Sequence, residues 1–290
     1  MIRTATTYDI PTLKKIWDES FSDPINYVDF IFDRLAKPSD AIVYEDGGRV
    51  VSMLLMIDTK FVYSGQSVDA VYILGAATLT QYQNRGIMTY LLDHAESTAR
   101  QAGAQLAILV PGEQYLYSFY KRRGYSSDFS VRLIKLKPGM LDSIPGLDEP
   151  VVIDRISPSF IHSVREEALR ELPHVQWDVD RIKTAMEDSL VYGDHIAAYN
   201  GALGRAYAFY SIGKKKLFIK ECLGSSETAQ LALVKEIISE NQSRSVQMTL
   251  PLRSAIFEHE GGVVPYGMAK PLQVKSYLRD MKPYMNLMFD

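Results

Sequence analysis

The first residues whose types and spacing could do chemistry lie where a predicted strand passes into a predicted helix. The segment reads Gln83-Asn84-Arg85-Gly86-Ile87-Met88. A helix start exposes backbone N–H groups without intrahelical partners at the positive end of the helix dipole. Gly86 allows a ligand to approach the backbone closely. Together these features are typical of a site for a phosphate or pyrophosphate group, although many helices begin near a glycine without binding an anion.

A second segment with chemical potential is Phe119-Tyr120-Lys121-Arg122-Arg123-Gly124-Tyr125. Tyr120 is predicted near the end of a helix that follows a buried strand. A phenol with a pKa near ~10 can donate a proton to a leaving group and recover it from water. The alternative is a tyrosine that only packs on an amphipathic helix.

Taken together, the two segments resemble the GCN5-related N-acetyltransferase (GNAT) family over about residues 1–136. That family holds the pyrophosphate of acetyl-CoA in a Gln/Arg-x-x-Gly-x-Gly/Ala loop, which this sequence matches at Gln83 and Gly86 and departs from at Met88. The family's Tyr-x-x-x-Gly-aromatic segment is matched from Tyr120 to Tyr125. Within the family the chain is most similar to the Eis-type branch, in which a second acetyltransferase-like unit follows the first.

The resemblance implies an enzyme that transfers an acetyl group from acetyl-CoA to an amine on a small molecule, peptide or protein. Tyr120 would protonate the departing CoA thiolate. The implied cofactor-binding residues belong to the strand before the loop and to the loop itself: Ala76, Ala77, Thr78, Gln83, Asn84, Arg85, Gly86, Ile87 and Met88. The basic run 121–123 could meet the 3′-phosphate of CoA or simply suit the negative end of a helix dipole.

The base that would accept a proton from the attacking amine is not identifiable from the sequence. Glu113 precedes the Tyr120 helix and Asp69 begins the strand that leads to the loop, and each is also compatible with a solvated carboxylate. In the Eis-type branch the terminal carboxylate can reach the active site, so Asp290 is a further candidate. The apolar tail before Asp290 is expected to pack against the protein.

The elements that must position these residues follow from hydrophobic periodicity and turn signals. Strands and amphipathic helices alternate through the first half of the chain. The predicted elements are a strand at 2–5, helices over 10–17 and 27–35, strands at 41–44, 50–57, 60–63 and 68–79, a long helix from 86 to about 102, a strand at 106–110, a helix at 115–123 and a closing strand at 129–136.

The same order of elements returns after a stretch rich in proline and glycine, up to a short helix that ends at Gly261-Gly262. We therefore predict an α/β fold with mixed sheets (α+β) that contains two tandem GNAT-like domains, each a central mixed β-sheet flanked by helices. The catalytic domain is expected at 1–137, a linker at 138–150 and a second, degenerate GNAT-like domain at 151–290. The alternative to a duplication is that the two halves resemble each other by chance, because strands and helices alternate in any α/β domain.

The second half lacks both chemical features of the first. Phe257 stands where Tyr120 stands relative to a helix-ending glycine, and it has no hydroxyl. The strand–helix junction there contains Glu227, a carboxylate that suits the helix start and would repel another anion. We therefore expect a catalytically inactive unit that forms a wall of the acceptor pocket or a packing partner.

Composition excludes several classes of protein. The 290 residues are 47% hydrophobic and 23% charged, which is typical of an ordered globular chain. The net charge of −3 gives no bulk attraction for nucleic acid. The single cysteine, Cys222, excludes a disulfide framework, and the five histidines have no metal-ligand spacing. No segment has the length of a membrane span or a signal peptide, so we expect a cytoplasmic protein without a metal or a membrane partner.

Two other function classes are alternatives to an enzyme. A non-catalytic acyl-CoA-binding or regulatory protein is favoured by the departure at Met88 and by the lack of an obvious base. A nucleotide-binding α/β protein is disfavoured because the loop has one glycine and no Gly-x-Gly-x-x-Gly run. The acceptor amine and the oligomeric state are not indicated by the sequence.

Overall fold

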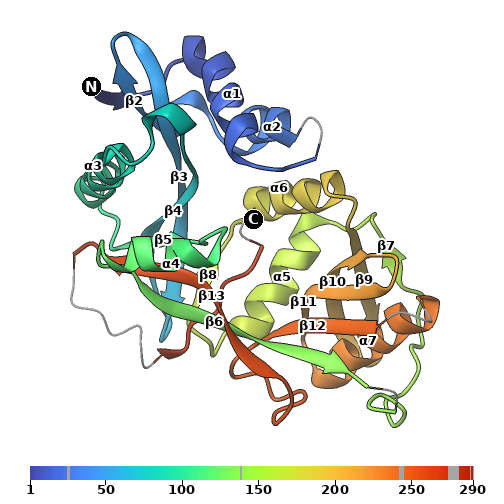
Figure 1. The fold of residues 1–290 in the computed structure, drawn as a ribbon. Helices are drawn as coiled ribbons and strands as arrows, with labels where there is room; N and C mark the ends of the chain where they lie inside the picture. The colour runs from blue at the N-terminus through green and yellow to red at the C-terminus, as the bar shows by residue number, and fades with distance from the viewer. Residues whose placement is uncertain (25–26, 138, 242–244, 274–280, 288, 290) are drawn as a thin grey trace. The chain divides into compact units, whose positions relative to one another are not determined.

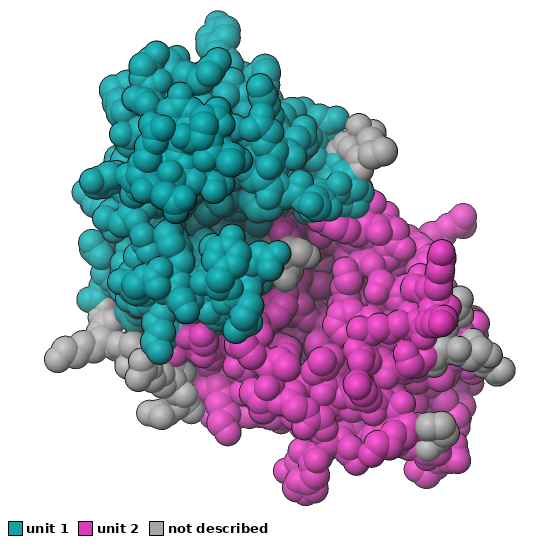
Figure 2. All heavy atoms as spheres, viewed as in Figure 1, with its two compact units in different colours: residues 1–61, 67–126, 267–277 teal, residues 62–66, 127–266, 278–290 magenta. Residues whose placement is uncertain are grey.

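Strands and amphipathic helices alternate along the chain, as the periodicity predicts (Figure 1). The computed structural model describes residues 1–24, 27–137, 139–241, 245–273, 281–287 and 289. Their contacts divide the chain into two compact units, coloured in Figure 2. Unit 1 comprises residues 1–61, 67–126 and 267–277, and unit 2 comprises residues 62–66, 127–266 and 278–290.

Unit 1 is built on a mixed sheet with the strand order β1-β2-β3-β4-β5-β13. The strands are β1 (Ile2–Thr4), β2 (Ala41–Asp46), β3 (Arg49–Tyr63), β4 (Gln66–Thr78), β5 (Leu106–Leu109) and β13 (Gly262–Pro271), of which unit 1 contains residues 267–271. The helices and helical turns are η1 (Thr7–Asp9), α1 (Ile10–Ser20), α2 (Tyr27–Phe30), η2 (Ile31–Leu35), η3 (Pro38–Asp40), η4 (Thr80–Tyr82), α3 (Ile87–Gln101) and α4 (Gln114–Lys121).

The helix α3 connects the two parallel strands of this sheet, β4 and β5. Its apolar residues recur every three or four positions, so Leu91, Ala95 and Ala99 share one face. That face is buried against strand residues that include Val71 and Ile73. The packing of this face fixes the start of α3 next to the end of β4.

Unit 2 repeats this topology with the strand order β7-β9-β10-β11-β12-β6. The strands are β6 (Ser126–Leu136), β7 (Val152–Ile153), β8 (His174–Gln176), β9 (His195–Gly201), β10 (Gly204–Ile212), β11 (Lys216–Gly224) and β12 (Ser245–Pro251), and the helices are α5 (Pro158–Leu169), α6 (Val179–Val191) and α7 (Glu227–Glu240). As in unit 1, one helix, α7, joins two parallel strands, β11 and β12. The predicted mixed α/β fold with two similar halves is therefore confirmed.

The closing strands of the two sheets differ from the prediction. We expected the strand at 129–136 to close the sheet of the first half. In the structure β5 instead pairs antiparallel with β13, for example Leu109 with Met268. The strand β6 pairs antiparallel with β12 in unit 2. Both units are therefore discontinuous in sequence, whereas the domains predicted at 1–137 and 151–290 are continuous.

A second correction concerns the short helix predicted before Gly261. The described residues 252–259 form turns instead. The buried guanidinium of Arg132 on β6 explains the difference, because it donates hydrogen bonds to the carbonyl oxygens of Ser254 (2.7 Å), Ile256 (2.8 Å) and Phe257. Those oxygens are the acceptors that a helix would need.

The apolar tail packs as expected within the described residues. Tyr284, Met285, Leu287 and Phe289 are all buried. The Tyr284 hydroxyl donates a hydrogen bond of 2.8 Å to the fully buried carboxylate of Glu221. Asp290 lies outside the described residues.

Candidate functional site

The end of strand β4 extends beyond its parallel neighbour. The last described pair between β4 and β5 is Tyr72 with Ile108, whereas β4 continues to Thr78. The remaining six residues span roughly 20 Å. On the edge of β4 that faces β5, these six residues can offer backbone N–H and C=O groups to an extended ligand. The predicted binding residues Ala76, Ala77 and Thr78 lie in this segment.

A glycine with a left-handed backbone interrupts this segment of β4. Gly75 has a φ of 61°, which in a strand interior marks a local bulge. A Cβ placed there would lie 2.3 Å from Cζ3 of Trp17, a buried residue of α1. The indole N–H of Trp17 donates to Asp23 at 2.7 Å, which fixes the ring. Helix α1 therefore packs directly on β4 beside Ala76, a contact that sequence reasoning missed although a glycine in an apolar strand was its signal.

Two side chains hold the carboxyl end of β4 in place. Ser52 is fully buried on β3, and its hydroxyl donates to the Ala77 carbonyl at 2.8 Å and lies 2.7 Å from the hydroxyl oxygen of Thr78. Gln83 donates from Nε2 to the Thr78 carbonyl at 3.0 Å. Gln83 thus shapes the loop by bonding back to the strand. Ser52 was not singled out, although it is the one polar residue among residues 50–57.

The start of α3 carries no side-chain cap and no carboxylate. Gly86 is its N-cap, with a φ of 77°, and the first turn contains no acidic residue. Residues 83–86 are exposed, and Asn84 also has a positive φ, of 60°. Backbone donors and the positive end of the helix dipole are thus open to an anion. These features suit the pyrophosphate of an acyl-CoA.

The side chains around the loop point away from this open helix start. Met88, where the sequence departs from the family pattern, packs against the buried cluster of unit 1. Arg85 donates to the Gln81 carbonyl at 2.8 Å, and its guanidinium lies 5.0 Å from the ring centroid of Tyr82. The departure at Met88 therefore adds to the core of the unit.

Helix α4 brings Tyr120 into the same cluster as the end of β4 and the start of α3. Tyr120 is 7% exposed, and Ala76 and Met88 pack against the cluster to which it belongs. Its ring makes edge contacts with Phe119 and Tyr125, with centroid distances of 5.1 and 5.7 Å. Within the described part of the chain, the Tyr120 hydroxyl has no hydrogen-bond partner.

The environment of Tyr120 keeps its phenol protonated. Burial raises the pKa of Tyr120 to about 12, an effect that the positive charge of Arg123 partly opposes. At neutral pH the hydroxyl therefore carries its proton and can donate it.

The candidate bases are not brought close to Tyr120. Glu113 is the exposed N-cap residue of α4, roughly 10 Å along the helix from Tyr120. Asp69 pairs with Lys60 at 3.0 Å at the opposite end of β4, roughly 30 Å along the strand from Thr78. This separation argues against Asp69 as the base. The position of Asp290 is outside the described residues.

The corresponding helix start in unit 2 is closed. Ser226 caps α7: its hydroxyl accepts from the Ala229 N–H at 3.0 Å and donates to the Leu203 carbonyl at 2.6 Å. Glu227 adds a carboxylate to the first turn. Since the cap and the carboxylate occupy the donor and the dipole that an anion would use, this helix start does not offer the site found at α3. Phe257, at the position that matches Tyr120, lies in a turn with a φ of 52°.

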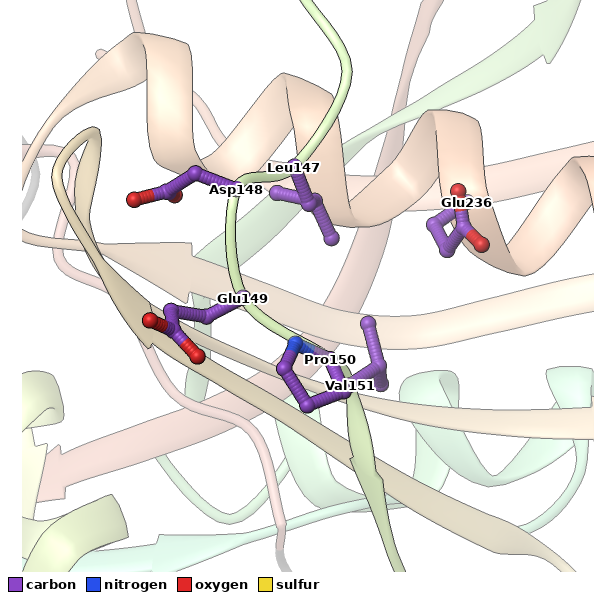
Figure 3. A pocket seen from close by; sticks show the side chains of 6 residues that line it. All are labelled: Leu147, Asp148, Glu149, Pro150, Val151 and Glu236. Carbon is purple, nitrogen blue, oxygen red and sulfur yellow. The ribbon is translucent and has the colours of Figure 1, made fainter.

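A hollow of about 250 Å³ lies elsewhere on unit 2, between the predicted linker and α7 (Figure 3). Its lining residues are Leu147, Asp148, Glu149, Pro150, Val151 and Glu236. The carboxylate of Glu236 points away from those of Asp148 and Glu149 in Figure 3. Asp148 is already bonded to the Tyr199 hydroxyl and, at 2.9 Å, to the Ala202 N–H. The hollow therefore lacks converging groups that could do chemistry.

No group of three or more His, Cys, Asp or Glu side chains in the described residues is arranged to hold a metal ion. Among the described helices, none is long and apolar enough to cross a membrane.

Comparison with known proteins shows which family unit 1 resembles. The family described as "Acetyltransferase (GNAT) domain" matches residues 1–127, which include β4, the loop, α3 and α4. Residues 1–127 are therefore similar to the GNAT acetyltransferase family. A search of curated proteins found no match.

Solved structures share the fold over nearly the whole chain. A protein of unknown function from Enterococcus faecalis V583 has a TM-score of 0.78 at 15% identity, covering 94% of this chain and 72% of that one. Eis1 from Mycobacterium abscessus has a TM-score of 0.72 at 13% identity, covering 94% and 74%. A tandem GNAT protein from the clavulanic acid biosynthesis pathway has a TM-score of 0.54 at 12% identity, covering 95% and 99%. The likeness shows a fold in which two GNAT-like halves follow each other.

Proposed function

We propose that unit 1 is an N-acetyltransferase that moves an acetyl group from acetyl-CoA to an amine acceptor, with Tyr120 as the general acid. One observation carries the proposal. The Tyr120 phenol is protonated, has no hydrogen-bond partner in the described chain, and shares a buried cluster with the end of β4 and the first turn of α3. A proton donor and an anion-binding helix start thus lie on one group of packed side chains.

The residues that would hold acetyl-CoA come from the open backbone of two elements. The N–H groups at Gly86, Ile87 and Met88 suit the pyrophosphate, because they have neither a cap nor a competing carboxylate. The edge of β4 at residues 76–78 suits the pantetheine arm. Bound acetyl-CoA supplies an activated acyl carbonyl and a thiolate leaving group.

The acceptor must be a neutral amine when it attacks. An alkyl amine has a pKa of around ~10.4, so only about one molecule in a thousand is neutral at pH 7. The nitrogen lone pair forms the new C–N bond, and the C–S bond breaks with its electron pair on sulfur. Tyr120 gives its proton to that sulfur and recovers one from water, and the ammonium proton leaves to a base or to solvent. Glu113 and Asp290 remain the proposed acceptors of this proton.

Backbone donors of β4 are placed to stabilise the charge that develops on the carbonyl oxygen. Residues 76–78 lie beyond the last pair with β5, so their N–H groups on that side are not used by β5. Fixed donors of this kind commonly contribute ~10²–10³ in rate. The Ser52 and Gln83 bonds described above hold this segment in position.

We further propose that unit 2 is catalytically inactive and that the chain is organised like the Eis-type branch. The capped, acidic start of α7 and the phenylalanine at position 257 support this. Titration should then detect one acetyl-CoA site per chain, and a second site of similar affinity would contradict the proposal. The acceptor would be an amine on a small molecule or a peptide.

Replacing Tyr120 by phenylalanine tests the proposal. Removal of a general acid commonly costs ~10²–10⁴ in rate, so Tyr120→Phe should lose most thiol release while keeping its affinity for acetyl-CoA. The matched control is Tyr115→Phe, which removes an exposed hydroxyl from the same helix. Thiol release from acetyl-CoA with a panel of amines gives the rate, and calorimetric titration gives the affinity. Full activity of Tyr120→Phe would remove Tyr120 from the mechanism, and binding without thiol release by the wild type would instead support a non-catalytic acyl-CoA-binding protein.

A further inference from the structure

We propose that Arg123 is a positioning residue for this acyl transfer: it fixes the Tyr120 phenol relative to the first turn of α3 and keeps an unpaired positive charge beside that phenol. The inference rests on the proposed function and gives a specific role to a residue that the sequence indicates only as part of the basic run 121–123.

The guanidinium of Arg123 is bound on all three nitrogens. Nε donates to the Thr89 hydroxyl oxygen at 3.1 Å, and Nη2 donates to the same oxygen. Nη1 donates to the Phe119 carbonyl at 2.8 Å. The guanidinium also lies over the Phe119 ring, and its Cζ is 3.5 Å from the ring centroid. Arg123 is therefore held in one geometry, which the single charged point of a lysine cannot reproduce.

The two helices that this contact joins are the ones on which the proposed chemistry depends. Thr89 is the third residue of α3, directly after the open helix start at Gly86. Arg123 lies in the turn directly after α4, where its backbone N–H donates to the Tyr120 carbonyl at 2.9 Å. The contact thus sets the separation between the proton donor and the site for the anionic part of the carrier. A misplacement of about 1 Å at such a distance can cost ~10²-fold in rate.

The charge of Arg123 is not used in an ion pair. In the described part of the chain, no carboxylate forms an ion pair with its guanidinium, although the charge of Asp93 acts on it from a longer distance. The group is half-buried, and it stands near the positive end of α3, where a cation is unfavourable. A charge kept in such a place is available to an anion that forms nearby, and its field already favours the ionised form of Tyr120. That ionised form is the one that Tyr120 must pass through after it protonates the thiolate.

Four variants separate geometry from charge. Arg123→Met removes both, Arg123→Lys keeps the charge, Thr89→Val removes the acceptor with little change of shape, and Thr89→Ser keeps the acceptor. Lys60→Met, at an exposed residue near the opposite end of β4, is the matched control. The measurements are kcat and KM for thiol release, the Kd of acetyl-CoA and the melting temperature of each variant.

We expect Arg123→Met to lower kcat by ~10–100-fold, with the Kd of acetyl-CoA changed by less than about threefold. Arg123→Lys and Thr89→Val should give smaller losses, and Thr89→Ser and Lys60→Met should stay close to the wild type. The double variant Arg123→Met/Thr89→Val should be no slower than Arg123→Met, because the two residues act through one contact.

Several outcomes overturn the inference. A folded Arg123→Met that keeps kcat within about twofold would do so, and so would a loss that appears only in Kd, which would make Arg123 a phosphate ligand. If Arg123→Met does not fold, unchanged kcat in Thr89→Val is decisive in the same way. A wild type that binds acetyl-CoA and releases no thiol with any amine would refute the proposed function itself, and the inference with it.

Discussion

Replacing Lys270 by methionine would show how the strand β13 is held in unit 1. The Lys270 ammonium pairs with Glu96 of α3, and the two side chains are 22% and 5% exposed. The ammonium also lies 5.7 Å from the centroid of the Tyr125 ring. Methionine keeps most of the apolar stem and removes the charge. The Glu96 carboxylate would then remain buried without its counter-ion.

The expected loss of stability can be worked from this burial. Removing one partner of a buried ion pair costs about 3–5 kcal/mol, because the remaining charge is not compensated. Lys270 is partly reached by water, so we expect the lower end of that range, about 3 kcal/mol, or roughly 150-fold in the unfolding equilibrium. The double variant Lys270→Met/Glu96→Leu removes both charges and should return to within about 1 kcal/mol of the wild type.

The two tryptophans of the chain allow the two units to be followed separately. Trp17 lies in unit 1 and Trp177 in unit 2, and both are buried. In a Trp177→Phe background, urea unfolding followed by tryptophan fluorescence therefore reports on unit 1. Lys60→Met is the matched control, because the Lys60–Asp69 pair is 55% and 65% exposed and should contribute less than about 1 kcal/mol.

The reasoning would be refuted by either of two results. One is a loss for Lys270→Met no larger than that of Lys60→Met. The other is a double variant as unstable as Lys270→Met alone, which would show that the lost interaction was packing by the lysine stem and not compensation of Glu96.

Two further predictions concern packing and pH. Gly75→Ala should destabilise the protein by about 2–4 kcal/mol, since a side chain is strained at a positive φ and its Cβ would overlap Trp17; a second substitution, Trp17→Leu, should restore part of the loss in urea unfolding. Hydrogen bonds of 2.8 and 2.9 Å from Arg3 hold the pKa of Asp9 well below its usual value near 3.8. Ionised Asp9 therefore stabilises the fold above about pH 4, and this stabilisation is lost as the pH falls further. Between pH 5 and pH 2.5 the midpoint of urea unfolding should therefore fall less in Asp9→Asn than in the wild type. An equal fall in both proteins would contradict this role of Asp9.

Local sequence signals predicted the part of the site that depends on neighbouring residues. The strand, the glycine loop and the helix that form the proposed anion-binding site follow one another within residues 66–101. Gly86 adopts the left-handed backbone that its residue type favours. The helix that carries Tyr120 was likewise expected from the stop signal at Gly124. Short-range periodicity and turn chemistry suffice for such elements.

The partner of each closing strand could not be predicted in the same way. The sequence predicts a strand at 129–136 but none at 262–271, and an alternating pattern indicates that a strand exists without identifying its neighbour. The pair of Leu109 with Met268 joins residues 159 positions apart in the sequence. Continuity along the chain suggested the wrong closing strand for the first half.

Contacts between side chains from distant elements were also beyond the sequence. Trp17 against Gly75, Ser52 against Ala77 and Thr89 against Arg123 each depend on how two elements are packed. Arg123 was noted only as a member of a basic run. Arg123 is bonded to Thr89 of α3, whereas its neighbours Lys121 and Arg122 are exposed.

The late position of β13 in the sequence has a consequence for synthesis. A nascent chain that has reached residue 250 contains every residue of unit 1 proposed to touch acetyl-CoA, yet it lacks residues 267–271 that pair with β5. Until these residues leave the ribosome, β5 presents an open edge that favours pairing with other chains. The proposed activity of unit 1 should therefore arise only after residues 267–271 have left the ribosome, and chains stalled before that point should depend on chaperones to avoid aggregation.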